Sequence, residues 1–309
     1  MPVKIKNGLP AEATLAQENV FVMTDLRASM QDIRPLHILV LNLMPTKETT
    51  ETQLLRMLGN SPLQVEVTFL RTATYQARHT DPEYLEVFYS TFDEVADRHF
   101  DGLIVTGAPV ENLNFTEVDY WPELVEIFDW AQRSVFSSLF ICWGAQAALY
   151  YYYGIDKRPL ARKCFGVFEH VVTDAKNKLT RGFDDVFWAP HSRHTTVAAD
   201  DIRACPELDL LASSEEAGAF LAASLDGRQV FVTGHAEYEA ETLKQEYERD
   251  VAAGLQIEAP KHYFPGDDPS ATPVVRWRAH ADLLFSNWLN YCVYQETPYD
   301  LTELQAREG

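Results

Sequence analysis

Apolar runs and amphipathic segments alternate through the first part of the chain. A short apolar run at 37–45 is stopped by Pro45, and leucines then recur at helical spacing through 46–62 until the turn residues GNSP. Residues 63–71 alternate apolar and polar side chains and include β-branched residues, as a half-buried strand does. This region therefore predicts an apolar strand, a helix and a second strand.

The alternation of strands and helices continues as far as residue 254. The predicted elements are a strand and Gly-Pro loop at 101–111, a helix at 120–132 with Pro122 in its first turn, a strand, sharp turn and helix at 139–154, a strand and turn at 227–238, and a helix at 239–254 closed by Gly254. Such an order is typical of an α/β fold, in which a mainly parallel sheet carries helices on both faces. We predict this fold class.

Length and composition allow one large domain or two small ones. The chain has 309 residues, of which 46% are hydrophobic, and this is ample for a sizeable core. No internal repeat or low-complexity linker divides it. We expect a single domain over 1–309, with an N-terminal arm at about 1–34. The aromatic and proline-rich tail, about 255–309, predicts an extension packed against the rest.

The charge balance argues against two classes of partner. Lys plus Arg number 26 and Asp plus Glu number 46, so the formal net charge is −20. A surface of this sign repels the phosphates of nucleic acids and anionic lipids. We therefore expect no nucleic acid and no membrane among the partners, and an anionic substrate would need a local basic pocket.

The location of the protein is predicted from its start, its apolar segments and its cysteines. The first twenty residues contain no apolar signal core, and no window supplies the about 18 apolar residues that a membrane helix needs. The four cysteines form no CxxC pair and have no ligand spacing with histidine, so we predict reduced thiols and no metal site in a cytoplasmic protein. They are Cys142, Cys164, Cys205 and Cys292.

Three loops leave predicted strands at the edge of the sheet where chemistry is usually found. In doubly wound sheets this is the edge formed by the carboxyl ends of the strands. The loops lie at 106–111, 142–146 and 234–238. Cys142 begins the second loop, between an apolar strand and a helix, and Gly144 follows it.

Cys142 is therefore a candidate nucleophile. A tight strand-to-helix turn lifts such a side chain out of the sheet, and the amino-terminal dipole of the following helix favours the thiolate. The backbone N–H of Trp143 would then face a developing oxyanion. A lone cysteine is more often a small buried hydrophobe, so this hypothesis depends on the context of the turn.

His235 and Glu237 are the candidate base and its partner. His235 follows an apolar strand and Gly234 at the same sheet edge. Glu237 is two residues further on, so both side chains point the same way if the segment is extended. A carboxylate in that position holds an imidazole and stabilises its charged form. Cysteine, histidine and glutamate in this order would act as nucleophile, base and orienting group.

These strings resemble known families. ICWGAQ and GHAEY resemble the class I glutamine amidotransferases, a flavodoxin-like fold with a Cys-His-Glu triad, although Phe140 replaces the glycine usual in that family. A closer resemblance covers nearly the whole chain. RPLHILVLNLMP, TETQLLRMLGNSPLQVEVTFLR, FDGLIVTGAP, LTRGFDDVFWAPHSR, FVTGHAEY and LLFSNWLNYCVYQETPYDL together resemble the homoserine O-acyltransferases of methionine biosynthesis.

The resemblance implies a two-step acyl transfer from an acyl-coenzyme A (acyl-CoA) to the hydroxyl of L-homoserine. Cys142 would become an acyl-thioester, His235 would shuttle protons and Glu237 would orient His235. Lys163 and Ser192 would contact the amino acid, and Arg249 could clamp its carboxylate bidentately. The family also implies a homodimer without a metal or a permanently bound cofactor. Without the resemblance, Lys163 and Arg249 are ordinary solvated residues.

Glu111 bears on the choice of acyl group. Members of the resembled family that use succinyl-CoA tend to have glycine at this position, whereas those with glutamate resemble acetyltransferases. The distal carboxylate of a succinyl group would meet the Glu111 carboxylate, and two like charges about 4 Å apart repel by roughly 4 kcal/mol at an effective dielectric of about 20. We therefore expect acetyl-CoA as donor, unless Glu111 turns toward solvent.

Other functions stay open on the sequence. Serine differs from homoserine by one methylene, which a pocket discriminates by only about 1–3 kcal/mol. A glutamine amidotransferase or γ-glutamyl hydrolase fits the triad, although the chain has no GxxxxGK[ST] loop. A non-catalytic binding protein on this fold is the third possibility, and the presence of all three triad residues disfavours it.

Overall fold

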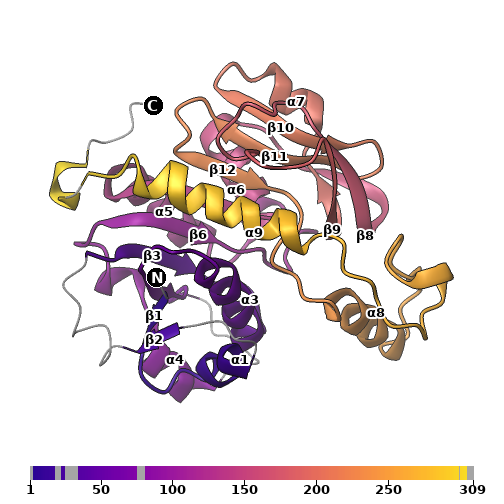
Figure 1. Ribbon diagram of the computed structural model, residues 1–309, viewed down its shortest axis with the longest axis horizontal. Helices are drawn as coiled ribbons and strands as arrows, with labels where there is room; N and C mark the ends of the chain where they lie inside the picture. Colours follow the sequence, from indigo (N-terminus) through magenta and orange to yellow (C-terminus); the bar gives the residue numbers. More distant parts are fainter. Residues whose placement is uncertain (1–2, 18–21, 25–33, 75–80, 299, 305–309) are drawn as a thin grey trace.

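The computed structural model describes residues 3–17, 22–24, 34–74, 81–298 and 300–304, and its described strands form one large sheet with helices on both sides (Figure 1). The strands are β1 (Val3–Ile5), β2 (Val22–Thr24), β3 (Leu36–Leu41), β4 (Val65–Leu70), β5 (Tyr89–Ser90), β6 (Phe100–Val105), β7 (Val135–Ile141), β8 (Arg158–Val172), β9 (Val186–Thr196), β10 (Leu208–Ser214), β11 (Gly218–Ser224) and β12 (Gln229–Val232). The helices are α1 (Ala11–Gln17), α3 (Lys47–Gly59), α4 (Pro82–Phe88), α5 (Trp121–Ser134), α6 (Trp143–Tyr153), α7 (Ala199–Ala204), α8 (Thr242–Ala252) and α9 (Arg278–Asn287).

The sheet has the order β2-β1-β4-β3-β6-β7-β12-β11-β10-β8-β9, and β5 pairs with β4. Every pairing from β2 to β12 is parallel, and every pairing from β12 to β9 is antiparallel. The predicted α/β fold with a mainly parallel sheet is confirmed. The antiparallel part was not predicted.

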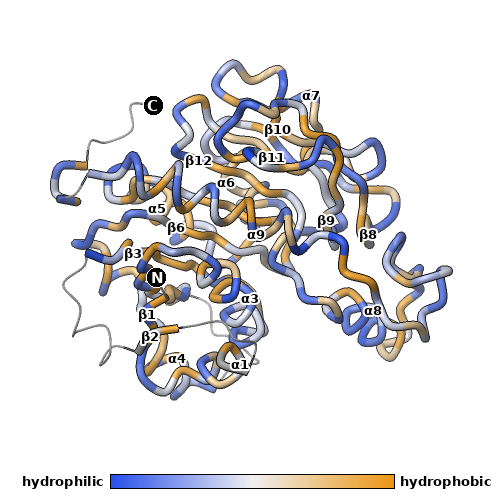
Figure 2. The backbone as a smooth tube through the Cα atoms, viewed as in Figure 1, coloured by the Kyte–Doolittle hydropathy of each residue, from blue (hydrophilic) through white to orange (hydrophobic). Residues whose placement is uncertain are grey.

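Helices cover both faces of the parallel part, which buries its strands on both sides. In β3, Ile38 and Val40 belong to one hydrophobic core, and Leu39 and Leu41 belong to the other. The first core includes apolar residues of α3 and α9, and the second includes those of α5 and α6. Figure 2 shows the resulting concentration of hydrophobic residues in the central strands. Continuous apolar runs such as β6 follow from this double burial.

The antiparallel part lacks a clear sequence pattern. The first half of β8 is largely exposed, and its register with β9 shifts between Pro159 and Cys164. Gly166, further along β8, has a φ of 146°, and a Cβ there would lie 2.4 Å from the carbonyl oxygen of Lys261. A bulged strand that is half exposed does not keep the alternation by which strands are recognised.

The C-terminal residues pack on the sheet through α9 and the π-helix η4 (Trp288–Tyr294), which follows it directly. Trp288 is fully buried, and its indole N–H donates a 3.0 Å hydrogen bond to the hydroxyl of Ser137 in β7. The indole lies against Gly102 of β6, where a Cβ would be only 3.0 Å from the ring. The single-domain organisation with an N-terminal arm stays a prediction, and residues 1–2, 18–21 and 25–33 of that arm lie outside the described residues.

Replacing Trp288 with alanine tests the contribution of this packing to stability. We expect a loss of about 3–5 kcal/mol in the free energy of unfolding, because the substitution leaves a large cavity and an unpaired hydroxyl. Urea denaturation measures this loss. Tyr294→Ala is the control, since Tyr294 is 54% exposed at the end of the same helix and its loss should change stability by less than about 0.5 kcal/mol. Equal effects of both substitutions would contradict the packing described.

Candidate active site

Cys142 lies on the sharp turn between β7 and α6. Its φ of 51° and ψ of −115° are rare for a residue with a side chain. The Cys142 N–H donates a 2.7 Å hydrogen bond to the carbonyl of Val232 in β12, which holds the turn at the sheet edge. Gly144 permits the close approach of the loop that follows β6, because a Cβ at Gly144 would lie 2.6 Å from the carbonyl oxygen of Thr106. The turn is therefore as sharp as the sequence predicts.

His235 and Glu237 pair in a buried position next to Cys142. The Nδ1 atom of His235 lies 2.7 Å from Oε1 of Glu237, and the imidazole also hydrogen bonds with Cys142. Only 4% of His235 and 6% of Glu237 are exposed. The segment is a turn rather than the extended chain used in the sequence argument, since the Tyr238 N–H donates to the His235 carbonyl. The two side chains nevertheless meet.

The electrostatics of this group favour a charged histidine. Burial by itself lowers the pKa of His235, but the negative charges of Cys142 and Glu237 and their hydrogen bonds outweigh it and raise the pKa well above its usual value. The Tyr238 ring stacks on the imidazole, with centroids 4.1 Å apart and planes 16° apart. The site can therefore hold a protonated imidazole beside Cys142.

The predicted loop at 106–111 lies over Cys142. A Cβ on Gly107 would be 3.3 Å from the Cβ of Cys142 and 3.5 Å from Cε1 of His235. The loops that follow β6, β7 and β12 therefore meet at one place, as expected for the carboxyl edge of a parallel sheet. Glycine at 107 leaves the space above Cys142 open.

The three positions expected to contact an amino acid lie on β8, β9 and α8, and two carboxylates join them. Lys163 Nζ is 3.5 Å from the carboxylate of Glu246 and 3.6 Å from that of Asp250. Ser192 donates a 2.5 Å hydrogen bond to Glu246, and Arg249 bonds Asp250 at 2.7 Å and 2.8 Å.

Neither Glu246 nor Asp250 is predicted from the sequence. They are four residues apart in α8 and therefore lie on one face of that helix. This spacing was the available signal, but the same spacing occurs on solvated helices. Only the contacts with β8 and β9 distinguish Glu246 and Asp250 from surface residues.

Glu111 does not turn freely into solvent. Its carboxylate accepts a 3.1 Å hydrogen bond from the backbone N–H of His194 in β9, and 16% of the side chain is exposed. Lys157 donates to the backbone carbonyls of Glu111 at 2.7 Å and Leu113 at 2.6 Å, and burial lowers the pKa of its ammonium. The loop that bears Glu111 is therefore fixed at both its backbone and its side chain.

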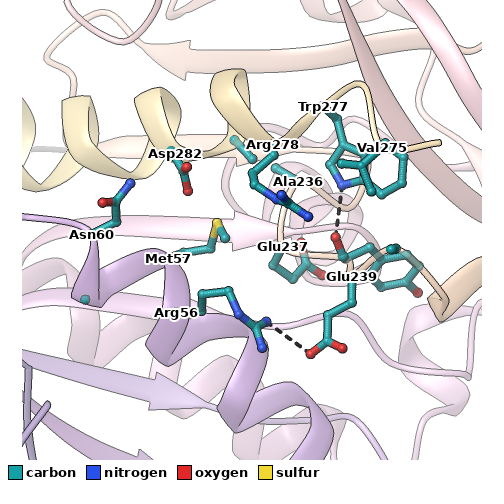
Figure 3. Close-up of a pocket in the computed structure, with 14 residues that line it drawn as sticks. Arg56, Met57, Asn60, Ala236, Glu237, Glu239, Val275, Trp277, Arg278 and Asp282 are labelled. Carbon is teal, nitrogen blue, oxygen red and sulfur yellow. Dashed lines mark hydrogen bonds and ion pairs between the residues drawn. The ribbon is translucent and has the colours of Figure 1, made fainter. Parts of the chain in front are cut away.

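The turn that carries Glu237 forms part of the lining of a cavity of about 790 Å³. Figure 3 shows its walls, with Arg278 and Asp282 of α9 on one side and Arg56 of α3 on the other. Arg56 bonds the carboxylate of Glu239 at 3.0 Å, which ties the turn to α3. The second carboxylate oxygen of Glu237, Oε2, is buried and has no hydrogen-bond partner in the described part of the chain.

The described residues contain neither a cluster of metal ligands nor a helix suited to span a membrane. No group of three or more histidine, cysteine, aspartate or glutamate side chains there is placed to hold a metal ion. None of the helices described has the length and apolar character to cross a membrane.

The fold and the site define a class of α/β protein in which a cysteine on a strained strand-to-helix turn faces a buried histidine–glutamate pair. The family described as homoserine O-succinyltransferase matches residues 2–299. The chain belongs to this family of homoserine O-acyltransferases. A homoserine O-acetyltransferase of Acetivibrio thermocellus is 59% identical over 99% of this chain and 100% of its own length. One of Geobacillus kaustophilus is 61% identical over 97% and 99%.

Solved structures are similar at low sequence identity. The structure titled SMU.1228c has a TM-score of 0.56 at 16% identity and covers 82% of this chain and 99% of that chain. A glutamine amidotransferase from Methylobacillus flagellatus has a TM-score of 0.49 at 12% identity, over 90% and 98%. The similarity to the structure titled SMU.1228c shows the fold alone.

The pKa of His235 should fall when Cys142 is replaced with alanine, because the negative charge of Cys142 is among the causes that raise it. In the wild type the imidazole should stay protonated through pH 7, and in the variant it should lose its proton at a lower pH. NMR titration of isotopically labelled histidine measures both values. His170 is the internal control, since burial lowers its pKa to about 3 without a contribution from Cys142. An unchanged pKa of His235 would contradict the coupling.

Proposed function

We propose that this protein is a homoserine O-acetyltransferase that transfers an acetyl group from acetyl-CoA to the hydroxyl of L-homoserine through an acyl-cysteine. The observation that carries the proposal is the buried contact of His235 with both Cys142 and Glu237 at the carboxyl edge of the sheet. Relatives named homoserine O-acetyltransferase, about as long as this chain, support the same substrates.

In the first half-reaction the Cys142 thiolate attacks the carbonyl carbon of the acetyl thioester. The tetrahedral intermediate collapses with cleavage of the bond to the coenzyme A sulfur, which leaves acetyl-Cys142. His235 starts this step protonated and can give its proton to the departing thiolate. The backbone N–H of Trp143, at the first residue of α6, stabilises the oxyanion.

In the second half-reaction His235 acts as a base. It removes the proton from the hydroxyl of homoserine as that oxygen attacks acetyl-Cys142, and the thiolate leaves. Glu237 keeps the Nδ1 side of the imidazole occupied, so the other nitrogen faces the reacting groups. General-base catalysis of this kind contributes about 10²–10⁴-fold to the rate.

Lys163, Ser192 and Arg249 are the proposed contacts of the amino acid acceptor. The cations of Lys163 and Arg249 suit its carboxylate, and both now pair with acidic side chains of α8. A carboxylate that enters can exchange places with those internal partners. We propose homoserine rather than serine as the acceptor because the similar proteins are named homoserine O-acetyltransferase.

The proposal extends to the setting of the enzyme. We place the protein in the cytoplasm as a homodimer that uses no metal and no permanently bound cofactor. Its product is the O-acetyl ester of homoserine, an activated amino acid for methionine biosynthesis. The acidic surface agrees with small-molecule substrates rather than nucleic acid.

Intact-protein mass spectrometry after mixing with acetyl-CoA alone tests the covalent route. We expect an acetyl adduct that maps to Cys142 and disappears when homoserine is added. Cys142→Ala should give no adduct, and Cys205→Ser, at a thiol without an assigned role, should give the full adduct. A succinyl adduct in place of the acetyl adduct would overturn the donor, and no adduct from either donor would overturn the covalent mechanism.

Glu111→Gly should raise the use of succinyl-CoA relative to acetyl-CoA by at least about tenfold, which corresponds to about 1.4 kcal/mol. The substitution removes a carboxylate that the His194 N–H holds in place. Rates of Cys142 acylation by the two donors measure the ratio. Glu111→Gln removes the charge but keeps the size, so an intermediate ratio is expected. An unchanged ratio in both variants would show that Glu111 does not select the donor.

A further inference from the structure

The turn that carries Glu237 is weakly held from within. The hydrogen bond inside it, from the Tyr238 N–H to the His235 carbonyl, is long at 3.3 Å. Residues 236–240 also line the cavity of about 790 Å³, so side chains do not pack closely against that side of the turn. The position of Glu237 therefore depends on contacts from elsewhere in the chain.

Two aromatic residues of the C-terminal part hold the backbone of this turn. The indole N–H of Trp277 donates a 2.9 Å hydrogen bond to the carbonyl of Tyr238, and the phenol of Tyr263 donates to the carbonyl of Ala240. Figure 3 shows the first of these bonds, beside the cavity. Trp277 is 2% exposed and Tyr263 is fully buried, so water competes little for either carbonyl. Both rings belong to the hydrophobic core, which fixes the two donors.

The bond from Trp277 acts on the peptide that directly follows Glu237. A shift of the Tyr238 carbonyl therefore moves the Glu237 side chain. Oε1 of Glu237 lies 2.7 Å from Nδ1 of His235, and Oε2 is buried without a hydrogen-bond partner among the residues that the structure describes. Because the carboxylate has this one side-chain partner, the backbone must place it correctly.

Arg56 is a tether of a different kind. It bonds the carboxylate of Glu239 at 3.0 Å, but the Glu239 side chain is 42% exposed. Exposed ion pairs contribute little because solvent screens them and long side chains lose entropy. We therefore expect the buried bond from Trp277 to be the stronger restraint on the peptide after Glu237.

We propose that Trp277 is a positioning residue of the active site, whose hydrogen bond to the Tyr238 carbonyl keeps Glu237 in contact with His235. The effect on the reaction rests on the proposed function. The inference gives the C-terminal part, which the sequence predicts only as a packed extension, a role in catalysis. The loss of one buried hydrogen bond corresponds to a change in rate of about 3- to 10-fold.

The test compares two buried tryptophans. Trp277→Phe removes the indole N–H and keeps an aromatic ring in the core. Trp288→Phe is the matched control, because it removes another buried indole N–H of the C-terminal part, whose acceptor is Ser137 near the start of β7. Mass spectrometry measures the rate of Cys142 acetylation over a range of acetyl-CoA concentrations. NMR titration of labelled histidine measures the pKa of His235, and urea denaturation measures stability.

In Trp277→Phe the maximal rate of Cys142 acetylation should fall by about 3- to 10-fold. The acetyl-CoA concentration that gives half the maximal rate should change by less than about twofold, because donor binding is not altered. The pKa of His235 should fall, since the charge of Glu237 and its hydrogen bond are among the causes that raise it. Trp288→Phe should lose a similar amount of stability in urea and keep the wild-type rate and His235 pKa.

The variant Glu237→Gln shows whether Trp277 acts through Glu237. In that background the additional change Trp277→Phe should slow acetylation by less than about twofold, because the interaction that Trp277 supports has already been lost. The two effects should therefore be strongly non-additive.

An equal fall in rate in Trp277→Phe and Trp288→Phe would overturn the inference, because the rate would then follow stability. An unchanged pKa of His235 in Trp277→Phe would overturn it, and so would an effect of Trp277→Phe that persists in full in Glu237→Gln. A failure of the proposed function is distinct, since it would show as a wild-type protein that acetyl-CoA does not acetylate. The pKa comparison needs no substrate and would still decide whether Trp277 positions Glu237.

Discussion

The positive φ of Cys142 is the constraint on which the rest of the site depends. A positive φ at a residue with a side chain costs of order 1–3 kcal/mol and persists only where the surroundings determine it. Here the hydrogen bond to Val232 and the absence of a side chain at Gly144 determine it. The turn directs the sulfur toward His235, and a more relaxed backbone would direct it back into the sheet.

The parallel and antiparallel parts of the sheet supply different residues of the site. The parallel part provides the three loops that bring Gly107, Cys142 and His235 together, because parallel strands end at a common edge. The antiparallel part provides Lys163 on β8 and Ser192 on β9, and α8 adds the acids that pair with them. Under the proposed function, chemistry and acceptor recognition come from elements that are built differently, and β12 joins them because it pairs with β7 on one side and β11 on the other.

The sequence is most informative where one physical requirement dominates. Double burial makes β3 and β6 continuous apolar runs. Cys142 stands out because it directly follows such a run, and His235 because only Thr233 and Gly234 separate it from one. Lys163 and Arg249 could be selected only by family resemblance, since a charged residue on a helix or strand is usually solvated. Glu246 was missed for the same reason. Its position depends on a tertiary contact with β9, and no local pattern records that contact.

The packing of Trp288 also determines when one face of the sheet can be covered. The hydrogen bond between Trp288 and Ser137 joins residues 151 positions apart in the chain, and α9 covers a face of strands that are synthesised much earlier. Until the last part of the chain has left the ribosome, that apolar face has no cover, and non-local contacts of this kind form late. A newly made chain therefore exposes this apolar face of the sheet until α9 has been synthesised. Protection by chaperones matters most in that interval.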